Sequence, residues 1–321
     1  MLVTGASGFV GRAVCMQLAK DHEVRRVIRS DDGDRMHATE TCVVGEIGPH
    51  TRWESALAGM EGVVHLAAKV HVIQQPTQAV RDEYQRVNVD GTEMLARAAA
   101  DAGVKRFVYL STVKVQGEAT PCYRPFVESD KPEPRDLYGE SKWTAEQSLA
   151  SVSKDTGMEV VILRPPMIYG AGVKANFLLL LRAVERGWPL PLGRVSNRRS
   201  LIYVENLADA VTNCLHHPDA AGRTFLVADA AISIADLVRK LSVGLGRRSR
   251  LFPVPVTILR GVGALLGKSS AVDRVTSSLV VDDGEIRRVV GWRPPISMED
   301  GLRATCNWYK SAYRQKASRG Q

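Results

Sequence analysis

The chain has 321 residues, of which 45% are hydrophobic and 24% charged, enough for two folded domains with sizeable cores. This composition excludes bulk disorder, collagen and a small disulfide scaffold. Five scattered cysteines without a CxxC pair predict a reduced, cytoplasmic protein with no metal site. No apolar run reaches the roughly 20 residues that a membrane-spanning helix needs, and the first residues show no signal-peptide pattern.

The first half alternates short apolar runs with longer helical patterns. We expect strands at Leu2–Val3, Val24–Ile28, Gly62–Leu66, Arg106–Leu110 and Val160–Leu163, and helices at Phe9–Lys20, Thr51–Leu57, Val87–Ala102 and Leu137–Ser153. Apolar strands that alternate with helices are typical of right-handed βαβ units and of a parallel sheet covered on both faces. The sequence therefore predicts an α/β protein with a Rossmann-type, doubly wound parallel sheet.

This regularity falls after Pro165-Pro166. Further helices are predicted at Ala175–Arg186, Glu205–His216, Ile234–Gly244 and Met298–Arg314. We place the boundary of an NAD(P)-binding domain at residues 1–165, completed by 200–228. Residues 166–199 and 229–321 would form a smaller C-terminal α/β substrate domain.

A glycine-rich loop follows the first apolar run and opens the first helix. It reads Thr4-Gly5-Ala6-Ser7-Gly8-Phe9-Val10-Gly11. Gly5 permits the tight turn, Gly8 lets backbone approach a pyrophosphate at the helix N-terminus, and Gly11 allows close helix–strand packing. This strand–loop–helix setting favours a dinucleotide site over a turn without a ligand.

The end of the second strand bears on the choice of cofactor. An acidic side chain there favours a free ribose 2′-hydroxyl, and an arginine accepts a 2′-phosphate. Here the strand ends in Arg29-Ser30, so NADP is favoured and NAD is the alternative. A plain surface arginine is also credible, because Arg25 and Arg26 are close by. Asp31 and Asp32 follow directly.

A Tyr-x-x-x-Lys pair, Tyr138 and Lys142, falls on one face of a predicted helix. A phenol of pKa about 10 is a poor base at neutral pH, and a nearby ammonium lowers that pKa. The pair can then move a proton to or from a carbinol while a nicotinamide moves hydride. Upstream, Ser111 and Thr112 end a strand, where a hydroxyl can bind the same substrate oxygen or simply cap the strand.

Together these motifs resemble the extended short-chain dehydrogenase/reductase superfamily and its nucleotide-sugar epimerase/dehydratase group. The resemblance implies catalysis by Thr112, Tyr138 and Lys142, and substrate contacts from Ser111. It also implies that Asn176 and Arg199 hold the substrate diphosphate, although Arg199 could be another surface charge beside Arg194 and Arg198. Besides the glycine loop, Arg29 and Ser30, it assigns cofactor contacts to Glu46, Ile47, Leu66, Ala67, Ala68, Lys69, Asn88 and Pro165.

Departures from the family pattern narrow the reaction. Dehydratases and decarboxylating relatives carry acidic residues just after the catalytic threonine, where this chain has Val113 and Lys114. Chemistry at C4 of a UDP-hexose remains. The local sequence resembles a bacterial surface-polysaccharide branch with 4-ketoreductases that act on UDP-2-acetamido-2,6-dideoxy-4-hexuloses. We lean to such a reductase, with a UDP-sugar 4-epimerase as the alternative.

Other classes stay open at this point. A steroid or dihydroflavonol-type reductase shares the glycine loop and the tyrosine–lysine pair, but it would not need Asn176 or Arg199. A catalytically silent dinucleotide-binding regulator would be expected to lose Tyr138 or Lys142. Relatives commonly dimerise through paired helices, so we expect a homodimer built on the helices near Thr92–Ala102 and Tyr138–Ser153.

The positive charge is unevenly distributed. The formal net charge is +8, and the segment 237–272 contains seven basic residues and no acidic ones. This segment could form a solvated basic face without a partner, or it could contact an anionic membrane or an anionic ligand. We expect no nucleic-acid partner, because aromatic residues make up only 6% and no nucleic-acid motif is present.

Overall fold

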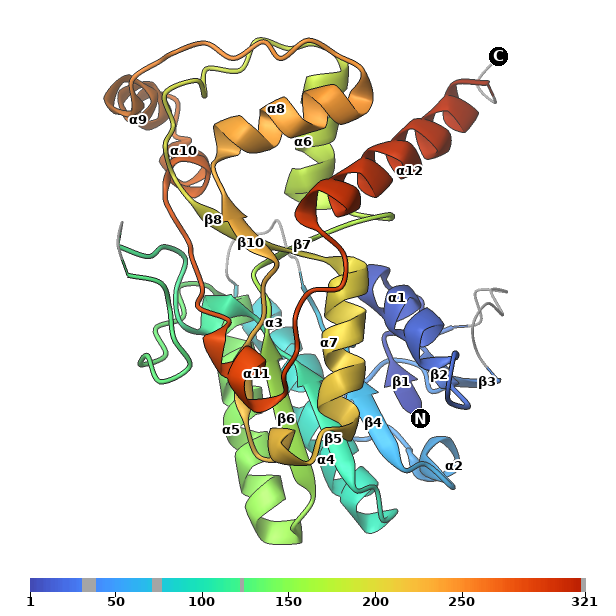
Figure 1. Ribbon diagram of the computed structural model, residues 1–321. Coiled ribbons are helices and arrows are strands. Elements are labelled where there is room, and N and C mark those ends of the chain that lie inside the picture. The colour runs from blue at the N-terminus through green and yellow to red at the C-terminus, as the bar shows by residue number, and fades with distance from the viewer. Residues whose placement is uncertain (31–38, 71–76, 122–123, 319–321) are drawn as a thin grey trace.

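The computed structural model describes residues 1–30, 39–70, 77–121 and 124–318, and it divides into a large sheet and a smaller lobe (Figure 1). The spatial order of the large sheet is β3 (Glu40–Val43), β2 (Arg25–Ile28), β1 (Leu2–Thr4), β4 (Gly62–His65), β5 (Arg106–Leu110), β6 (Glu159–Arg164) and β9 (Thr224–Leu226). Every neighbouring pair runs parallel. The predicted Rossmann-type α/β fold is confirmed.

Helices cover both faces of this sheet. They are α1 (Phe9–Leu18), α2 (Glu54–Leu57), α3 (Gln78–Tyr84), α4 (Gly91–Asp101), α5 (Leu137–Thr156) and α7 (Val204–His216). Successive strand residues point to opposite faces. In β1, Leu2 packs in the cluster with α4 and α5, whereas Val3 packs in the cluster with α1 and α7. Burial on both faces explains why these strands read as continuous apolar runs.

The smaller lobe has its own sheet and most of the remaining helices. Its strands are β7 (Met167–Tyr169), β8 (Arg199–Tyr203) and β10 (Ala230–Ile232), with β8 parallel to β7 and antiparallel to β10. The helices are α6 (Ala175–Glu185), α8 (Ile234–Leu245), α9 (Val256–Leu265), α10 (Ser269–Thr276), α11 (Gly284–Val289) and α12 (Met298–Ser318). Of these, α8 packs on α6 and α12, while α11 packs on β9 at the edge of the large sheet.

Within the described ranges there are also three short helical segments: η1 (Gln85–Asp90), a π-helix, and the 3₁₀ turns η2 (Val113–Val115) and η3 (Pro218–Ala220). The helix predicted over Val87–Ala102 is therefore a π-turn that leads into α4. Strands β3, β7 and β10 and helices α3, α9, α10 and α11 have no counterpart among the predicted ranges. Among the described residues, Cys15, Cys42, Cys214 and Cys306 carry free thiols, and Cys122 lies outside the description.

The order of the strands places a crevice at the middle of the large sheet. From β1 the chain builds β2 and β3 on one side, and then β4, β5 and β6 on the other. At such a reversal, the connections after neighbouring strands leave in opposite directions, and ligands bind outside the carboxyl ends of the strands. Here the reversal falls between β1 and β4, which end at Thr4 and His65.

Candidate active site

The glycine loop is closely packed against the loop that follows β4. Gly5 has φ +65°, and a Cβ there would lie 2.8 Å from the backbone nitrogen of Ala67. A Cβ on Gly11 would lie 2.1 Å from the carbonyl oxygen of Gly5, and one on Gly8 would lie 3.0 Å from the same oxygen. Backbone approach therefore requires glycine at positions 5 and 11, and a side chain at position 8 would be tightly packed.

Helix α1 begins at this loop with Gly8 as its N-cap. Within the described residues, no side chain caps the helix and its first turn contains no acidic residue. Its first amides and its dipole are thus available to an anion. Ser7 is exposed beside them, and Phe9 and Val10 are half-buried. The loop and helix start fit the pyrophosphate of a dinucleotide.

Buried polar contacts hold the two central strands at the crevice. The hydroxyl of Thr4 accepts hydrogen bonds from the amides of Leu66 and Ala67, both at 3.2 Å. The ring of His65 lies 2.6 Å from the Thr4 hydroxyl through Nδ1 and 3.0 Å from the Thr92 hydroxyl through Nε2. Burial, with the nearby Lys142 charge, lowers the pKa of His65 to about 3. The neutral ring of His65, on β4, therefore links β1 and α4 through hydrogen bonds.

Asn88 links the loop after β4 to helix α5. Its Oδ1 accepts from the Lys69 amide at 2.7 Å, and its Nδ2 donates to the Lys69 carbonyl at 3.0 Å and to the Ser141 hydroxyl at 2.9 Å. The Lys69 ammonium pairs with Glu83 at 2.6 Å. Leu66, Ala67 and Ala68 are half-buried along the same loop.

Tyr138 and Lys142 lie near the carboxyl end of β5. Asp136 caps α5 by accepting from the Gly139 amide at 2.7 Å. The Lys142 Nζ donates to the carbonyl of Leu110 at 2.7 Å, and it lies 6.0 Å from the centroid of the Tyr138 ring. Thr112 is the second residue after β5, and its hydroxyl accepts a hydrogen bond from the Lys114 amide at 3.3 Å. The fold thus brings Tyr138 and Lys142 together at the end of the strand that leads to Thr112.

Burial dominates the protonation of this pair. It raises the pKa of Tyr138 above its ordinary value, with smaller contributions from Asp136 and Tyr84. Burial also lowers the pKa of Lys142 to about 7, and Glu146 opposes that shift. The lowering of the Tyr138 pKa expected from the Lys142 ammonium is not seen here, because desolvation of the phenol sets its pKa. Tyr138 starts as a proton donor.

A buried ion pair that the sequence analysis did not identify links helix α5 to strand β6. The side chains of Arg164 and Glu146 are 5% and 2% exposed and meet through two hydrogen bonds of 3.0 and 2.5 Å. Ser111 donates to the same carboxylate at 2.5 Å, so its hydroxyl is engaged there. Beside them, the carbonyl of Pro165 accepts from the Val113 amide at 3.0 Å. These contacts fix the turn that carries Thr112.

The side of the crevice assigned to adenosine is more open. Arg29 and Ser30 are exposed directly after β2, whereas Arg26 is buried and Arg25 is held by Glu40 at 2.6 Å. Of the three arginines, the structure thus exposes Arg29 at the end of the strand. Glu46 is exposed and pairs with Arg86 at 3.1 Å. Ile47 packs over Gly91, and a Cβ on Gly91 would lie 2.7 Å from Cγ2 of Ile47. Asp31 and Asp32 lie outside the described residues.

The two residues assigned to the substrate diphosphate lie in the smaller lobe. Asn176 is exposed in the first turn of α6. Arg199 begins β8, and its Nη1 donates to the carbonyls of Arg274 at 3.0 Å and Ser277 at 3.2 Å. Phe9 approaches this lobe, since a Cβ on Gly172 would lie 3.4 Å from its ring.

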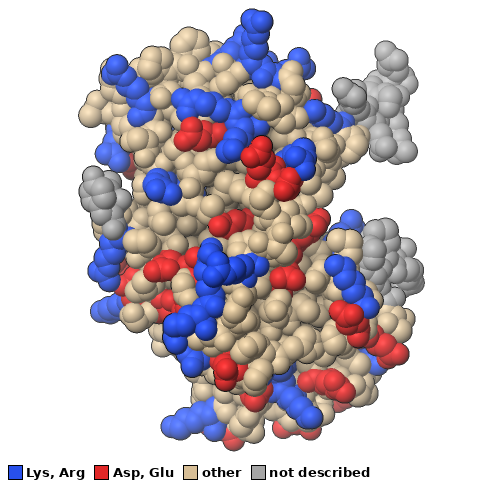
Figure 2. Space-filling view, viewed as in Figure 1, with Lys and Arg blue, Asp and Glu red and all other residues tan. Residues whose placement is uncertain are grey.

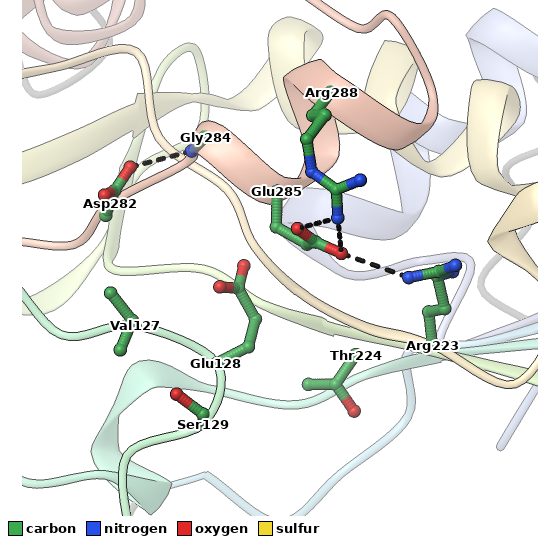
Figure 3. Close-up of a pocket in the computed structure, with 9 residues that line it drawn as sticks. All are labelled: Val127, Glu128, Ser129, Arg223, Thr224, Asp282, Gly284, Glu285 and Arg288. Atoms are coloured by element: carbon green, nitrogen blue, oxygen red, sulfur yellow. Dashed lines mark hydrogen bonds and ion pairs between the residues drawn. The ribbon is translucent and has the colours of Figure 1, made fainter.

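A cavity of about 840 Å³ lies elsewhere, between the loop at Val127, strand β9 and helix α11 (Figure 3). Glu285 there pairs with Arg223 at 3.1 Å and with Arg288 at 2.6 Å. None of the predicted site residues lines it. This cavity opens beside Thr224, which begins the edge strand β9. The crevice for the dinucleotide lies at the opposite, carboxyl ends of the strands. We therefore do not assign the cavity to the reaction.

Among the helices of the described residues, none combines the length and the apolar character that crossing a membrane would require. The same residues contain no group of three or more histidine, cysteine, aspartate or glutamate side chains arranged to hold a metal ion.

The glycine cradle, the open helix start and the tyrosine–lysine pair define a nicotinamide-dinucleotide enzyme of the extended short-chain dehydrogenase/reductase class. The chain belongs to the NAD dependent epimerase/dehydratase family, which matches residues 1–228. The resemblance seen in the sequence is thereby confirmed, and the protein is a nicotinamide-dinucleotide-dependent enzyme of the nucleotide-sugar epimerase/dehydratase type.

Individual relatives cover nearly the whole chain. The UDP-glucose 4-epimerase of Vibrio cholerae is 40% identical over 320 residues, covering 97% of this chain and 96% of that protein. A 3-beta-hydroxysteroid dehydrogenase of Mycolicibacterium neoaurum is 27% identical over 349 residues, covering 100% and 94%. Among solved structures, MoeE5 in complex with UDP-glucose and NAD shares the fold with a TM-score of 0.77 at 24% identity, covering 97% and 99%.

Proposed function

We propose that this enzyme exchanges hydride at C4 of a UDP-hexose, with Thr112, Tyr138 and Lys142 as its catalytic groups. The observation that carries the proposal is the position of Tyr138 and Lys142 at the end of β5, beside the strand that meets β1 at the crevice. Two acids lie near the turn after Thr112, but both Glu118 and Asp136 are ion-paired with Lys114. This pairing supports C4 chemistry over dehydration, which needs a carboxyl group as acid or base.

The bound nicotinamide would supply or take up the hydride. The amides of the glycine loop and of α1 would hold its diphosphate, and Asn88 keeps the neighbouring loop in place. Tyr138 gives its proton to the C4 oxygen, while the hydroxyl of Thr112 binds that oxygen. Lys142, held by the Leu110 carbonyl, would contact the cofactor ribose. Its ammonium would stabilise the Tyr138 phenolate left by this transfer, until the phenolate takes a proton back from solvent.

We favour net reduction of a UDP-2-acetamido-2,6-dideoxy-4-hexulose. Arg29 supports this, because an exposed arginine at the end of β2 suits the 2′-phosphate of NADPH. The raised pKa of Tyr138, caused by burial, also supports a starting state that donates a proton. A reductase must release its oxidised cofactor after each turnover.

A UDP-sugar 4-epimerase is the second candidate, and the Vibrio cholerae relative at 40% identity favours it. The same three catalytic groups would serve, but the hydride would return to the opposite face of C4. An epimerase must therefore retain its cofactor. The two reactions differ in cofactor exchange and not in the residues named here.

Cofactor content separates the two candidates. The purified chain is denatured, and the released nucleotide is measured by absorbance and chromatography. A reductase should be mostly cofactor-free and should consume NAD(P)H stoichiometrically with a 4-keto-6-deoxy UDP-sugar. Tightly bound NAD, together with interconversion of C4 epimers without added reductant, would show an epimerase. A thermal shift with a steroid but none with UDP would reject the nucleotide-sugar class.

The NADP preference is tested at Arg29. Arg29→Ala should weaken NADPH binding by about 1.5–3 kcal/mol, because a charge-assisted hydrogen bond to the 2′-phosphate is lost. NADH binding should hardly change, and it serves as the control within the same titration. Equal affinity of the parent enzyme for both cofactors would remove the premise.

Two organisational proposals accompany this function. We infer a nucleotide-binding domain of residues 1–165 and 200–228, with the rest of the chain binding substrate. We also infer a homodimer that pairs α4 and α5 of two copies. Light scattering on the eluting enzyme tests the dimer, and a monomeric mass at micromolar concentration would reject it.

A further inference from the structure

Helix α9 presents an apolar face to solvent. Ile258, Val262 and Leu265 follow the spacing i, i+4 and i+7, which places them on one stripe of the helix, and the C-cap residue Leu266 follows directly. Their exposed fractions are 54%, 49%, 88% and 65%. On an ordinary surface helix the apolar stripe faces the core and the polar face meets water. In α9 the apolar stripe is outside.

The opposite side of α9 is already occupied. Gly263 is its one buried residue within the described chain, and a Cβ there would lie 2.6 Å from Cγ2 of Val272 on α10. Arg260 pairs with Asp273, also on α10, at 3.3 Å. These contacts fix the rotation of α9, so Leu265 and Leu266 point outward because α10 holds the other face.

Exposed basic side chains are concentrated in the same segment of the chain as this apolar stripe. The segment 237–272 has seven bases and no acid, and two of the bases, Arg239 and Arg260, pair with the flanking Asp236 and Asp273. The other five are exposed: Lys240, Arg247, Arg248, Arg250 and Lys268. Figure 1 places α9 at the outer edge of the smaller lobe, and Figure 2 shows basic side chains along the top of that lobe.

We propose that this face, formed by the apolar stripe of α9 and the five exposed bases, docks on an anionic lipid bilayer. A ten-residue helix, about 15 Å long, is too short to span a bilayer but can lie in its interface. Its apolar side chains enter the acyl boundary, while Arg247, Arg248 and their neighbours meet the lipid phosphates.

Charge decides against the other occupants. A nucleic acid would neutralise the bases but leave Leu265 and Leu266 in water. A second copy, related by a two-fold axis, would bring the same basic segment against itself, and repulsion between like charges opposes such an interface. An anionic bilayer satisfies both the charge and the apolar surface.

Vesicle flotation tests the proposal with the full-length enzyme. We expect it to float with phosphatidylcholine vesicles that contain phosphatidylglycerol, to stay behind with pure phosphatidylcholine, and to detach at high salt. Leu265→Glu with Leu266→Glu, and separately Arg247→Ala with Arg248→Ala, should each lower the partition coefficient about tenfold or more. All four residues are exposed, so thermal midpoints should match the parent.

The matched control is Val43→Glu, which adds an acid at an apolar position that is 53% exposed on β3 of the large sheet. It should float like the parent. Absence of binding by the parent at low salt, or undiminished binding by the double glutamate variant, would overturn the proposal. So would a fall in oligomeric mass in that variant without vesicle binding by the parent, which would identify a self-association surface.

Discussion

The cofactor side and the substrate side of the site differ in what holds their functional groups. On the cofactor side, Gly5, Asn88 and Lys142 are fixed by close backbone approach or buried hydrogen bonds at the ends of neighbouring parallel strands. On the substrate side, Asn176 is exposed in the first turn of α6, and Arg199 is bonded to two backbone carbonyls.

Topology explains the difference. A parallel sheet brings the carboxyl ends of its strands to one edge. Residues far apart in sequence therefore meet there regardless of the conformation of the connecting loops. The smaller lobe has three short strands and depends on side-chain contacts to place each group. Substitutions on the cofactor side should therefore act on chemistry or folding, and those on the substrate side on affinity.

The largest effect is expected from Tyr138→Phe. Removing the proton donor should lower kcat by about 10²–10⁴-fold, while cofactor affinity stays close to that of the parent. Steady-state kinetics and a cofactor titration measure the two quantities. Tyr309→Phe is the matched control, because its hydroxyl bonds Glu185 on the far side of the smaller lobe. Near-parental turnover in Tyr138→Phe would end the catalytic assignment.

A comparable but structural effect is expected from Gly11→Ala. The new methyl group would overlap the Gly5 carbonyl oxygen, and relieving that overlap should cost about 3 kcal/mol of unfolding free energy and weaken cofactor binding. Gly261→Ala in α9 is the control, since no atom lies within 4 Å of its Cβ position. Helix propensity should make that variant neutral or slightly more stable. Urea unfolding compares them, and equal stability would contradict the close packing.

The sequence could predict the parts that repeat a pattern. Apolar runs located β1, β2, β4, β5 and β6, and the spacing of Tyr138 and Lys142 placed both on one helix face. Apolar periodicity did not locate β3, because Glu40–Val43 is a partly exposed edge strand with little apolar signal. The Glu146–Arg164 pair also escaped prediction, because periodicity shows a residue's face but not its partner on a different element.

Arg199→Ala sharpens the distinction on the substrate side. If Arg199 holds the diphosphate, UDP-sugar affinity should fall by about 1.5–3 kcal/mol with little change in kcat. Calorimetry measures the UDP affinity of the variant, and urea unfolding measures its stability. Arg194→Ala, at an exposed position in the neighbouring loop, is the control. A loss of stability with unchanged UDP affinity would instead assign Arg199 to the backbone carbonyls of Arg274 and Ser277.

The smallest effect is expected at Asp229, where the chain passes from β9 to β10 and so joins the two halves. Its carboxylate accepts from the Tyr203 amide at 2.6 Å, the Asn206 amide group at 2.8 Å and the Tyr169 hydroxyl at 3.3 Å. Burial raises its pKa from 3.8 to about 6, although those hydrogen bonds oppose the shift.

Because the pKa is higher in the folded state, the folded chain binds more protons between about pH 4 and pH 6. This contribution to stability is complete below the unfolded pKa and is lost as the pH rises through about 6. Asp229→Asn cannot titrate, so its unfolding free energy should fall by about 1–2 kcal/mol less than that of the parent across this window. Urea unfolding at a series of pH values measures both slopes. Parallel profiles would show that Asp229 does not carry this proton, and a steeper loss in the variant would reverse the assigned sign.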